Sequence, residues 1–514
     1  MNKLVKDIDT VINQAGLKSG MTISFHHHLR NGDYLLNMVL DAAAKKGIKN
    51  LTLHASSIFE CHEPLIDHIK NGVVTQIYCN YMSKTVGRFI ASGGMKKPVI
   101  FRTHGSRPGD IMNGKTPIDI AFIGAPTSDD AGNCTGKRGK ARFGSMGYAM
   151  ADAEKAKKVV VITDNLVEYP MPGASITEDH VDYVVEVESI GDPELIVSGT
   201  TTITRDPVRL RMAQMAVKCI EAAGLLKDGM SFQTGAGGAT LAVAKYLKER
   251  MLEKGVVGSY ITGGITSYSV DLQKSGCFKA LLDVQSFDTG AAADLDVNPN
   301  HIEVSGIQYA SAEGKSTTMT KLDCAMLGAT EIDVDFNVNV HTDSMGNIMG
   351  GSGGHTDICE QCRMAVIIAP LFRNRLPIIL DHVRTVSTQG KYVDLLITEK
   401  GVAVNKTVKK NRVPDLERKL KAAGIPVVSI QNLKKLAEEI CGTPKSAPKG
   451  KRIVAEVLGH SGEHVDYIYN VPTAEEAAKA TAKKAPAKKA PAKKAPAKKV
   501  AAKKAPAKKA AAKK

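Results

Sequence analysis

Tryptophan is absent from this chain of 514 residues, and aromatic residues make up only 5% of it. No stretch reaches the roughly 18 consecutive apolar residues that a membrane-spanning helix needs, so we expect no membrane span. The first residues, MNKLVKDIDTVINQAG, lack the apolar core of a secretory signal, which indicates a cytoplasmic protein. The nine cysteines are scattered without the spacing of a disulfide framework, so we expect reduced thiols.

Most of the positive charge lies at the C-terminal end. The net charge is +16, but residues 473–514 contain 15 Lys and 2 Glu, which accounts for +13 and leaves +3 for the rest. The remaining body has no basic patch with interleaved aromatic residues, so nucleic-acid binding by the body has no support.

The segment over residues 471–514 is of low complexity. It repeats AKKAP units, and its apolar residues are almost all Ala. Such a segment cannot bury enough apolar surface to offset chain entropy, so we predict a disordered Lys/Ala/Pro-rich tail. The tail either attaches the chain electrostatically to an acidic surface, such as nucleic acid or partner proteins, or acts as a solubilising extension. Both alternatives stay open.

Landmarks in the body occur twice in the same order. GLKSGM at residues 16–21 and GLLKDGM at residues 224–230 each precede a strand-like run. GNCTG at residues 132–136 and GNIMG at residues 346–350 each lead, after a helical stretch, into another strand-like run. We therefore predict two related α/β domains, residues 1–205 and 206–470.

Short Val/Ile-rich runs alternate with helical patterns in each half. Strands are predicted at residues 98–101, 118–123, 159–163, 365–369 and 377–380, and helices at residues 207–223 and 239–253. Nearly continuous apolar strands separated by helices are typical of mainly parallel sheets covered on both faces. Ligands bind at the carboxyl ends of such strands, so the loops that follow strands are the candidate sites.

One glycine-rich loop consists of Gly235, Ala236, Gly237 and Gly238. It lies between a predicted strand and a predicted helix, an arrangement that gathers backbone N–H groups and can bind phosphate or an oxyanion. The spacing is GxGG rather than the GxGxxG of dinucleotide-binding folds. We favour an oxyanion or thioester-carbonyl site, with a dinucleotide site and a simple tight turn as the alternatives.

A second glycine-rich loop consists of Gly350, Gly351, Ser352, Gly353 and Gly354, followed by His355. Glycines let a backbone approach an extended ligand closely. A flexible linker is the alternative, but apolar sequence flanks the loop on both sides. The nearby Cys359 and Cys362 lack a second pair, so we expect two ordinary thiols and no metal site.

Cationic and hydrogen-bonding side chains follow two predicted strands of the first half. They are His26, His27, His28, Arg30 and Asn31 after one strand, and Arg102, His104, Ser106 and Arg107 after the other. If both strands belong to one sheet, these side chains reach the same edge and suit a substrate with several carboxylates. Clustered histidines can also bind metal, but neighbouring residues on a strand point to opposite faces. Solvated loop charges stay the alternative for any single residue.

An acidic alternation occurs at residues 331–336. It predicts a strand with Glu331, Asp333 and Asp335 on one face and apolar residues on the other. The three acids are either solvated or face a cleft, and the pattern does not choose between these alternatives.

The order of these motifs resembles the CoA-transferase superfamily. GAGG, SFDTGA, NPNHI, ATEIDVDFNVNV, GGSGG and LITEKGVA follow one another as in the second half of its members. HHHLRNGD and HGSRPGD narrow the resemblance to the alpha subunit family of bacterial citrate lyases. The resemblance covers nearly the whole chain up to about residue 470 and leaves out the tail.

The resemblance implies two tandem domains with an active site between them, the first on the carboxylate side and the second on the thioester side. It implies a transferase that converts acetyl-carrier protein and citrate to citryl-carrier protein and acetate. The implied partners are a beta subunit, which cleaves the citryl thioester, and a gamma acyl carrier subunit with a phosphoribosyl-dephospho-CoA group. No cofactor is expected on this chain.

One position departs from the acetate-type members of the superfamily. Those enzymes have a nucleophilic Glu in a segment resembling GIHTEMISDGVVDL, whereas residues 259–272 read SYITGGITSYSVDL and place Gly263 at the Glu position. We therefore expect a citrate carboxylate to attack the acetyl thioester directly and form a mixed anhydride. The protein would supply orientation and oxyanion stabilisation.

Three groups of residues are expected to serve this reaction. The transfer region is formed by Gly235, Ala236, Gly237, Gly238, Gly263 and Gly264. The citrate-binding group is His26, His27, His28, Arg30, Asn31, Arg102, His104, Ser106 and Arg107. The thioester-arm group is Glu331, Asn337, Gly350, Gly351, Ser352, Gly353, Gly354 and His355. An acetate-type CoA-transferase or acyl-CoA hydrolase is the nearest alternative, and a nucleic-acid-binding protein with a polycationic tail is the alternative from another class.

Overall fold

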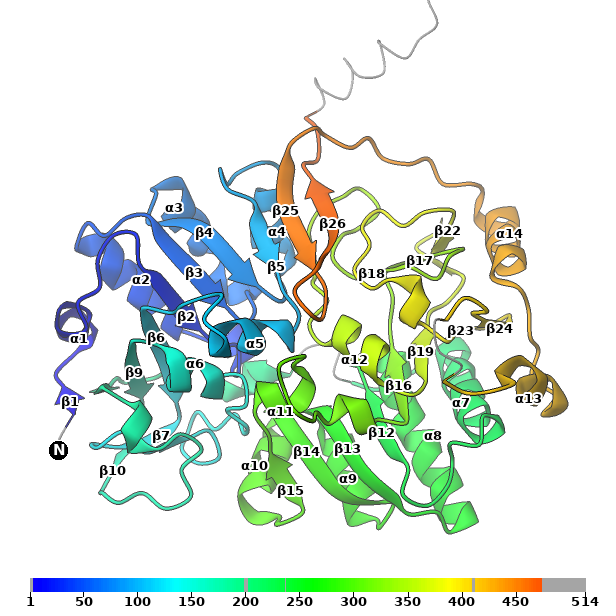
Figure 1. Ribbon diagram of the computed structural model, residues 1–514, viewed down its shortest axis with the longest axis horizontal. Helices are drawn as coiled ribbons and strands as arrows, with labels where there is room; N and C mark the ends of the chain where they lie inside the picture. Colours follow the sequence, from blue (N-terminus) through cyan, green and yellow to red (C-terminus); the bar gives the residue numbers. More distant parts are fainter. Residues whose placement is uncertain (1–2, 198–201, 236, 409–411, 474–514) are drawn as a thin grey trace, which may run out of the picture. The chain divides into compact units, whose positions relative to one another are not determined.

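Two large, mainly parallel β-sheets form the framework of the molecule (Figure 1). The computed structural model describes residues 3–197, 202–235, 237–408 and 412–473. The first sheet has the spatial order β1 (Leu4–Val5), β11 (Tyr183–Glu186), β9 (Lys158–Thr163), β6 (Ile120–Ala125), β2 (Thr22–Phe25), β3 (Leu51–Ala55), β4 (Val74–Cys79), β5 (Val99–Phe101), β25 (Ile453–Leu458) and β26 (His464–Tyr469). The second has the order β15 (His301–Glu303), β14 (Phe278–Ser286), β13 (Gly258–Ile265), β12 (Ser231–Thr234), β16 (Cys324–Leu327), β19 (Ala365–Ile368), β23 (Leu395–Thr398) and β24 (Gly401–Val404).

Short strands form three smaller sheets. They are β10 (Leu166–Val167), β7 (Thr127–Asp129) and β8 (Cys134–Thr135); β18 (Val338–Asn339), β17 (Glu331–Asp333) and β22 (Ile379–Leu380); and the pair β20 (Phe372–Arg373) and β21 (Leu376–Pro377).

The two large sheets share one topology. The order β11-β9-β6-β2-β3-β4-β5 of the first recurs as β23-β19-β16-β12-β13-β14-β15 in the second. The repeated sequences at residues 132–136 and 346–350 also occupy equivalent positions in the two halves. Each follows an aspartate, Asp129 or Asp343, that accepts backbone N–H groups from a turn ending in Gly-Asn. The predicted fold class, two related α/β units with mainly parallel sheets, is confirmed.

A strand from the end of the chain pairs with the N-terminal sheet, which bears on where the two domains are divided. The hairpin β25–β26 comes last along the chain but joins the first sheet, where β25 runs parallel to β5. Residues 453–469 thus pair with the N-terminal half. The boundaries 1–205 and 206–470 stay a prediction.

Helices cover the sheets. Those of the first half are α1 (Ile8–Gln14), α2 (Leu35–Lys45), α3 (Leu65–Lys70), α4 (Lys84–Ala91), α5 (Ser106–Met112) and α6 (Met150–Lys155). The remainder are α7 (Pro207–Ala222), α8 (Gly238–Lys254), α9 (Ser267–Lys274), α10 (Thr289–Val297), α11 (Gly306–Ala310), α12 (His355–Gln361), α13 (Leu416–Ala422) and α14 (Ile430–Cys441). Within the described ranges, no helix is long and apolar enough to cross a membrane.

The two predicted helices at residues 207–223 and 239–253 are confirmed as α7 and α8. The Asp206 side chain caps α7 by accepting the Val208 N–H, and Pro207 occupies the first helical position, where its missing N–H costs nothing. Gly255 ends α8 with a left-handed backbone, at φ +66°.

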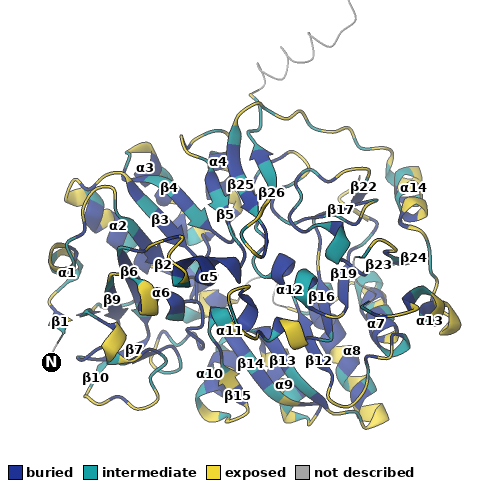
Figure 2. Ribbon diagram, viewed as in Figure 1, coloured by how far each residue is buried: buried dark blue, intermediate teal, exposed yellow. Residues whose placement is uncertain are grey.

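Strands of the second sheet are buried on both faces (Figure 2). In β19, Val366 and Ile368 pack into a core with α7 and α8, whereas Ala365 and Ile367 pack into a core on the opposite face. Alternate side chains point to opposite faces of a strand, which explains why the sequence is apolar without interruption.

The predicted strand over residues 331–336 is wrong beyond Asp333. Strand β17 ends there, and the Asp333 carboxylate accepts the N–H groups of Asp335 and Asn337. This local hydrogen bonding turns the chain, with Phe336 at φ +64°, and leaves Asp335 exposed while Glu331 and Asp333 are buried. The run at residues 377–380 is likewise divided between β21 and β22.

Candidate functional site

Polar rings gather beyond the carboxyl ends of β2, β3 and β5. We call His26, His27, His28, His54 and His104 the histidine cluster; the first four are buried and His104 is partly buried. The His27 ring stacks on that of His104 with centroids 5.6 Å apart, and the Tyr148 ring lies 4.5 Å from that of His104. The prediction that the two segments meet at one sheet edge is confirmed.

Burial keeps these histidines neutral. It lowers the pKa of His26 and of His104 to about 3, because a charged imidazole loses its hydration there. His26 Nε2 and both ring nitrogens of His28 and of His54 have no hydrogen-bond partner among the described residues. Buried polar groups normally have partners, which are ligands or water where the protein offers none. The cluster is therefore a candidate ligand-binding surface.

Arg107 lies among these rings but is paired within the protein. Its terminal nitrogens donate to both oxygens of Asp152 at 2.7 and 2.8 Å, and both side chains are buried. This bidentate pair fixes the guanidinium beside the cluster. Only the Arg107 Nε lacks a partner among the described residues.

Arg30 lies between aromatic rings from both halves. Its guanidinium is 5.4 Å from the Phe59 ring centroid and 4.8 Å from that of Phe287, which follows β14. Burial lowers the pKa of Arg30 to about 10, which still leaves it charged at neutral pH. Cation–π contacts with both rings help to hold the charge in place.

The second glycine-rich loop, residues 350–354, packs directly on the first half. Met82 N–H donates to the Gly350 carbonyl at 3.2 Å, and His104 N–H donates to the Gly353 carbonyl at 2.8 Å. A Cβ on Gly351 would lie 2.2 Å from the Asn80 carbonyl oxygen, so only glycine permits this approach. The structure thus joins this loop to the histidine cluster.

The second sheet also reaches this region. Gln285 of β14 donates from Nε2 to the His27 carbonyl at 3.0 Å. Gln233 of β12 donates from Nε2 to the Tyr309 hydroxyl at 3.0 Å, and a Cβ on Gly354 would lie 2.9 Å from that hydroxyl. Gln285 therefore links the end of β14 to the segment after β2, and Gln233 links β12, through Tyr309, to the 350–354 loop.

Gly263 and Gly264 lie in β13, next to Gln233 and Phe287 respectively. Gly263 has φ +103°, and a Cβ there would lie 2.4 Å from Gln233 Nε2. A Cβ on Gly264 would lie 2.2 Å from the Phe287 ring, the same ring that Arg30 covers. No side chain fits at either position without displacement of a neighbour.

The sequence predicts that amides of the first glycine-rich loop converge on an anion, but two of them are hydrogen-bonded within the protein. Gly235 N–H donates to the Met326 carbonyl and Gly237 N–H donates to the Gly235 carbonyl, so these two amides are already used. Gly238 begins α8, and Ala236 lies outside the described residues. Within the loop, the start of α8 is the remaining candidate for binding an anion.

Several other predicted residues have local roles. Asn31 accepts the Glu60 N–H, Arg102 pairs with Asp110, and the Ser106 hydroxyl accepts the Thr103 N–H. In the thioester-arm group, Glu331 accepts from Asn339, Asn337 accepts the Gly390 N–H, and His355 bonds to Thr388. The Ser352 hydroxyl is buried without a partner among the described residues.

The sequence reasoning missed Asn80, Tyr148, Gln233 and Tyr309. Asn80 follows β4 directly, so the rule about carboxyl ends of strands would have found it if applied to every strand. Gln233 lies two residues before Gly235, the first residue of the first glycine-rich loop. Tyr148 and Tyr309 lie outside the glycine-rich and basic motifs, and no local signal marks them.

Taken together, the site combines a fixed cation, neutral imidazoles and a glycine-lined backbone. Such a site can bind carboxylates and accommodate an extended chain close to the backbone. Within the described ranges, no group of three or more His, Cys, Asp or Glu side chains is arranged to hold a metal ion.

The chain is similar to known proteins over most of its length. The family described as "Citrate lyase, alpha subunit" matches residues 1–471. A citrate lyase alpha chain of Klebsiella pneumoniae is 44% identical over 473 residues, 92% of each chain. That of Escherichia coli K12 is 43% identical over 469 residues, 91% of each chain.

Two solved structures are also similar. One, described as the alpha subunit of citrate lyase from Streptococcus mutans in complex with citrate, has a TM-score of 0.89 and 45% identity and covers 92% of each chain. A malonate decarboxylase alpha subunit from Acinetobacter baumannii has a TM-score of 0.63 at 16% identity, over 86% of this chain and 93% of that one, and shares the fold.

Proposed function

The chain belongs to the citrate lyase alpha subunit family, and we propose that it exchanges acetyl for citrate on a carrier thioester where the two sheets meet. The role of the family is the citrate/acetyl transferase step of a multi-subunit citrate lyase. Acetyl-carrier and citrate give citryl-carrier and acetate.

One observation carries the proposal at the level of residues. The 350–354 loop accepts a hydrogen bond from the backbone N–H of His104, a member of the histidine cluster. The loop suits a pantetheine arm, and the cluster suits a polycarboxylate. The S. mutans relative was crystallised with citrate, at 45% identity to this chain. The two segments to which we assign the substrates are therefore in direct contact.

Citrate is held by Arg30 and the histidine cluster. Arg30 supplies a positive charge fixed between Phe59 and Phe287. His26 and His28 supply neutral ring nitrogens that the described residues leave unpaired. Arg107 supports this surface through its pair with Asp152 and offers only Nε, so we give it a smaller role than the sequence suggested.

The reaction needs no nucleophile from the protein. A citrate carboxylate oxygen attacks the acetyl thioester carbonyl, the C–S bond breaks, and a thiolate and a mixed anhydride form. The thiolate then attacks the citryl carbonyl, and acetate leaves. Gly263 supports this order of events, because a Glu there would collide with Gln233.

The protein contributes orientation and charge stabilisation. The first turn of α8, which begins at Gly238, presents N–H groups that have no acceptor within the helix, together with the positive end of a 17-residue helix. We assign the developing oxyanion to this turn. Removing one such donor in an acyl-transfer site typically lowers kcat about 10²–10³-fold.

The partners follow from the same family. We assign the chain to a cytoplasmic complex with a beta subunit, which cleaves citryl thioester, and a gamma carrier with a phosphoribosyl-dephospho-CoA arm. The prosthetic group belongs to the carrier, and this chain acts on it as substrate.

Mass spectrometry of the carrier tests the proposal. The full chain is incubated with acetyl-carrier and citrate, with a carrier lacking the prosthetic group as the control. We expect citryl-carrier and free acetate, with the chain itself unmodified. Absence of exchange would contradict the function, and an acyl group on the chain that hydroxylamine releases would contradict the direct attack.

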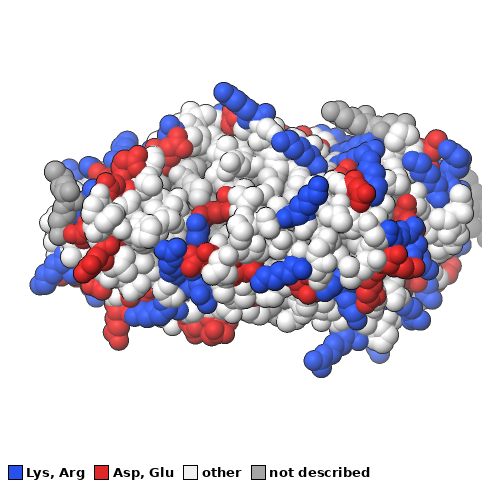
Figure 3. All heavy atoms as spheres, turned by 90° about the horizontal axis from the view of Figure 1, so that it is seen from below, with Lys and Arg blue, Asp and Glu red and all other residues white. Residues whose placement is uncertain are grey.

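A role in nucleic-acid binding has less support. The face drawn in Figure 3 has Lys and Arg interspersed with Asp and Glu rather than a single basic surface. The basic excess lies in residues 473–514. Such a role would therefore belong to the tail and not to the folded body.

A further inference from the structure

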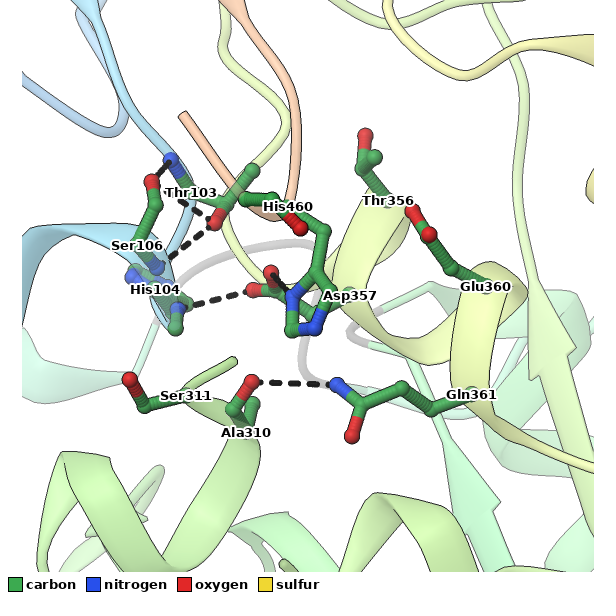
Figure 4. Close-up of polar contacts among 12 residues, drawn as sticks. Thr103, His104, Ser106, Ala310, Ser311, Thr356, Asp357, Glu360, Gln361 and His460 are labelled. Carbon is green, nitrogen blue, oxygen red and sulfur yellow. Dashed lines mark hydrogen bonds and ion pairs between the residues drawn. The ribbon is translucent and has the colours of Figure 1, made fainter. Parts of the chain in front are cut away.

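A histidine from the C-terminal hairpin reaches the centre of the molecule. His460 lies in the turn between β25 and β26, and its Nδ1 is 2.8 Å from Asp357 Oδ1 (Figure 4). His460 is 6% exposed and Asp357 is 0% exposed. A charged pair this deeply buried needs a specific role or a compensating partner.

Asp357 connects three segments that are distant in sequence. It lies on α12, which begins immediately after the 350–354 loop. Its Oδ2 accepts the Gly105 N–H at 2.8 Å, and its Oδ1 faces His460. One carboxylate therefore joins the second half, the loop after β5 and the terminal hairpin.

Two hydrogen bonds join the 104–105 segment to residues 353–357. His104 N–H donates to the Gly353 carbonyl, and the next residue, Gly105, donates to Asp357. A Cβ on Gly105 would lie 2.3 Å from the Ala310 carbonyl oxygen, so this segment has little freedom to shift. The backbone on both sides of the His104 Cα is thus held by hydrogen bonds.

The charge of the pair depends on both members. Burial raises the pKa of Asp357, and the hydrogen bond and charge of His460 offset part of this rise. Burial also opposes a charged His460, but the hydrogen bond and charge of Asp357 outweigh it and raise the pKa of His460. Other titratable groups face the pair: Glu360 and Glu463 towards His460, and Tyr148, Tyr309 and Cys359 towards Asp357.

We infer that His460 is a positioning residue for the acyl exchange, because through Asp357 it holds the His104–Gly105 segment against the 350–354 loop. The inference deepens the proposed function and rests on it. The C-terminal hairpin, β25 and β26, thereby becomes part of the site. None of the sequence motifs that pointed to the function lies in this hairpin.

The hairpin offers a matched control. His464 also contacts a carboxylate, with Nδ1 3.1 Å from Glu456 Oε1, but its side chain is 43% exposed. His464→Gln therefore removes the same type of contact from the same hairpin without touching Asp357. His460→Gln keeps a hydrogen-bond donor and loses the charge, whereas His460→Ala loses both.

The experiment compares full-length variants in the citrate exchange assay across pH. We expect His460→Ala to lower kcat by on the order of 10- to 100-fold, His460→Gln to lower it less, and His464→Gln to stay within about twofold of the wild type. The wild type should lose activity as His460 loses its proton, at a pH above the ordinary pKa of histidine. Asp357→Asn should move that loss to lower pH, and His460→Gln should abolish it.

Hydrogen exchange separates this inference from the proposed function. Peptides covering residues 102–107 and 350–357 should lose protection in His460→Ala and keep it in His464→Gln, whichever reaction the chain performs. A wild type without citrate exchange would defeat the proposed function alone. Unchanged protection, or an active wild type with unchanged kcat and pH profile in His460→Ala, would overturn the inference.

Discussion

Replacing Gly263 by Ala tests whether the position of the missing nucleophile accepts any side chain. The backbone there has φ +103°, which costs a non-glycine residue about 1–3 kcal/mol. The new Cβ would lie 2.4 Å from Gln233 Nε2, so Gln233 must move and lose its bond to Tyr309, a further loss of about 1 kcal/mol. The free energy of unfolding should therefore fall by about 2–4 kcal/mol.

Gly224→Ala isolates the backbone contribution. Gly224 has φ +77°, and among the described residues no atom beyond its chain neighbours lies within 4 Å of the place that a Cβ would take. It therefore shares the strain without the collision. Urea unfolding should give a larger loss for Gly263→Ala than for Gly224→Ala, by about 1 kcal/mol. Equal losses would refute the steric argument. Gly263→Glu should give no hydroxylamine-sensitive acyl-enzyme, and trapping one would show that a carboxylate side chain fits there and would refute the steric argument.

Three further predictions follow from the buried pairs, the histidines and the tail. Arg107→Met leaves Asp152 buried without its cation, so urea unfolding should show a loss of about 3–5 kcal/mol, most of which Arg107→Met with Asp152→Leu recovers. Burial lowers the pKa of His26 and His104 to about 3, so the unfolded chain binds more protons below about pH 6.5. Stability should be full above that pH and fall towards pH 3, and a urea midpoint that did not change with pH would contradict this. Deletion of Thr473–Lys514 should leave citrate exchange within about twofold and abolish salt-sensitive binding to a polyanion; loss of exchange would tie the tail to the reaction.

Much of the architecture follows from local sequence patterns. The apolar runs that became β5 and β9 were predicted from their composition, and Asp206 with Pro207 marks the start of α7 by ordinary capping chemistry. Placement of His26 to His28 near His104 followed from the rule that parallel strands share a carboxyl edge. These predictions succeed because each depends on few neighbours or on a general property of parallel sheets.

The misses have a different physical origin. Asp333 looks like a strand residue by alternation, yet its carboxylate captures the amides of the next turn. Arg107 looks like a free cation, but the Asp152 that pairs with it lies 45 residues away in sequence. Each residue's role is decided by a partner that its own neighbourhood does not reveal.

Duplication of one topology also explains why the two halves could divide the reaction. Matching strands place matching loops at the two carboxyl edges, but the residues on those loops differ. The first sheet presents imidazoles and guanidinium groups after β2 and β5, whereas the second half presents the 350–354 backbone, in the segment between β16 and β19, and the glycines of β13. In the function that we propose, the first edge binds the carboxylates and the second binds the thioester arm. With Gly263 in place of a carboxylate side chain, the direct attack that we propose uses no nucleophile from this position, and it requires both edges to meet, as His104 and Gly353 do.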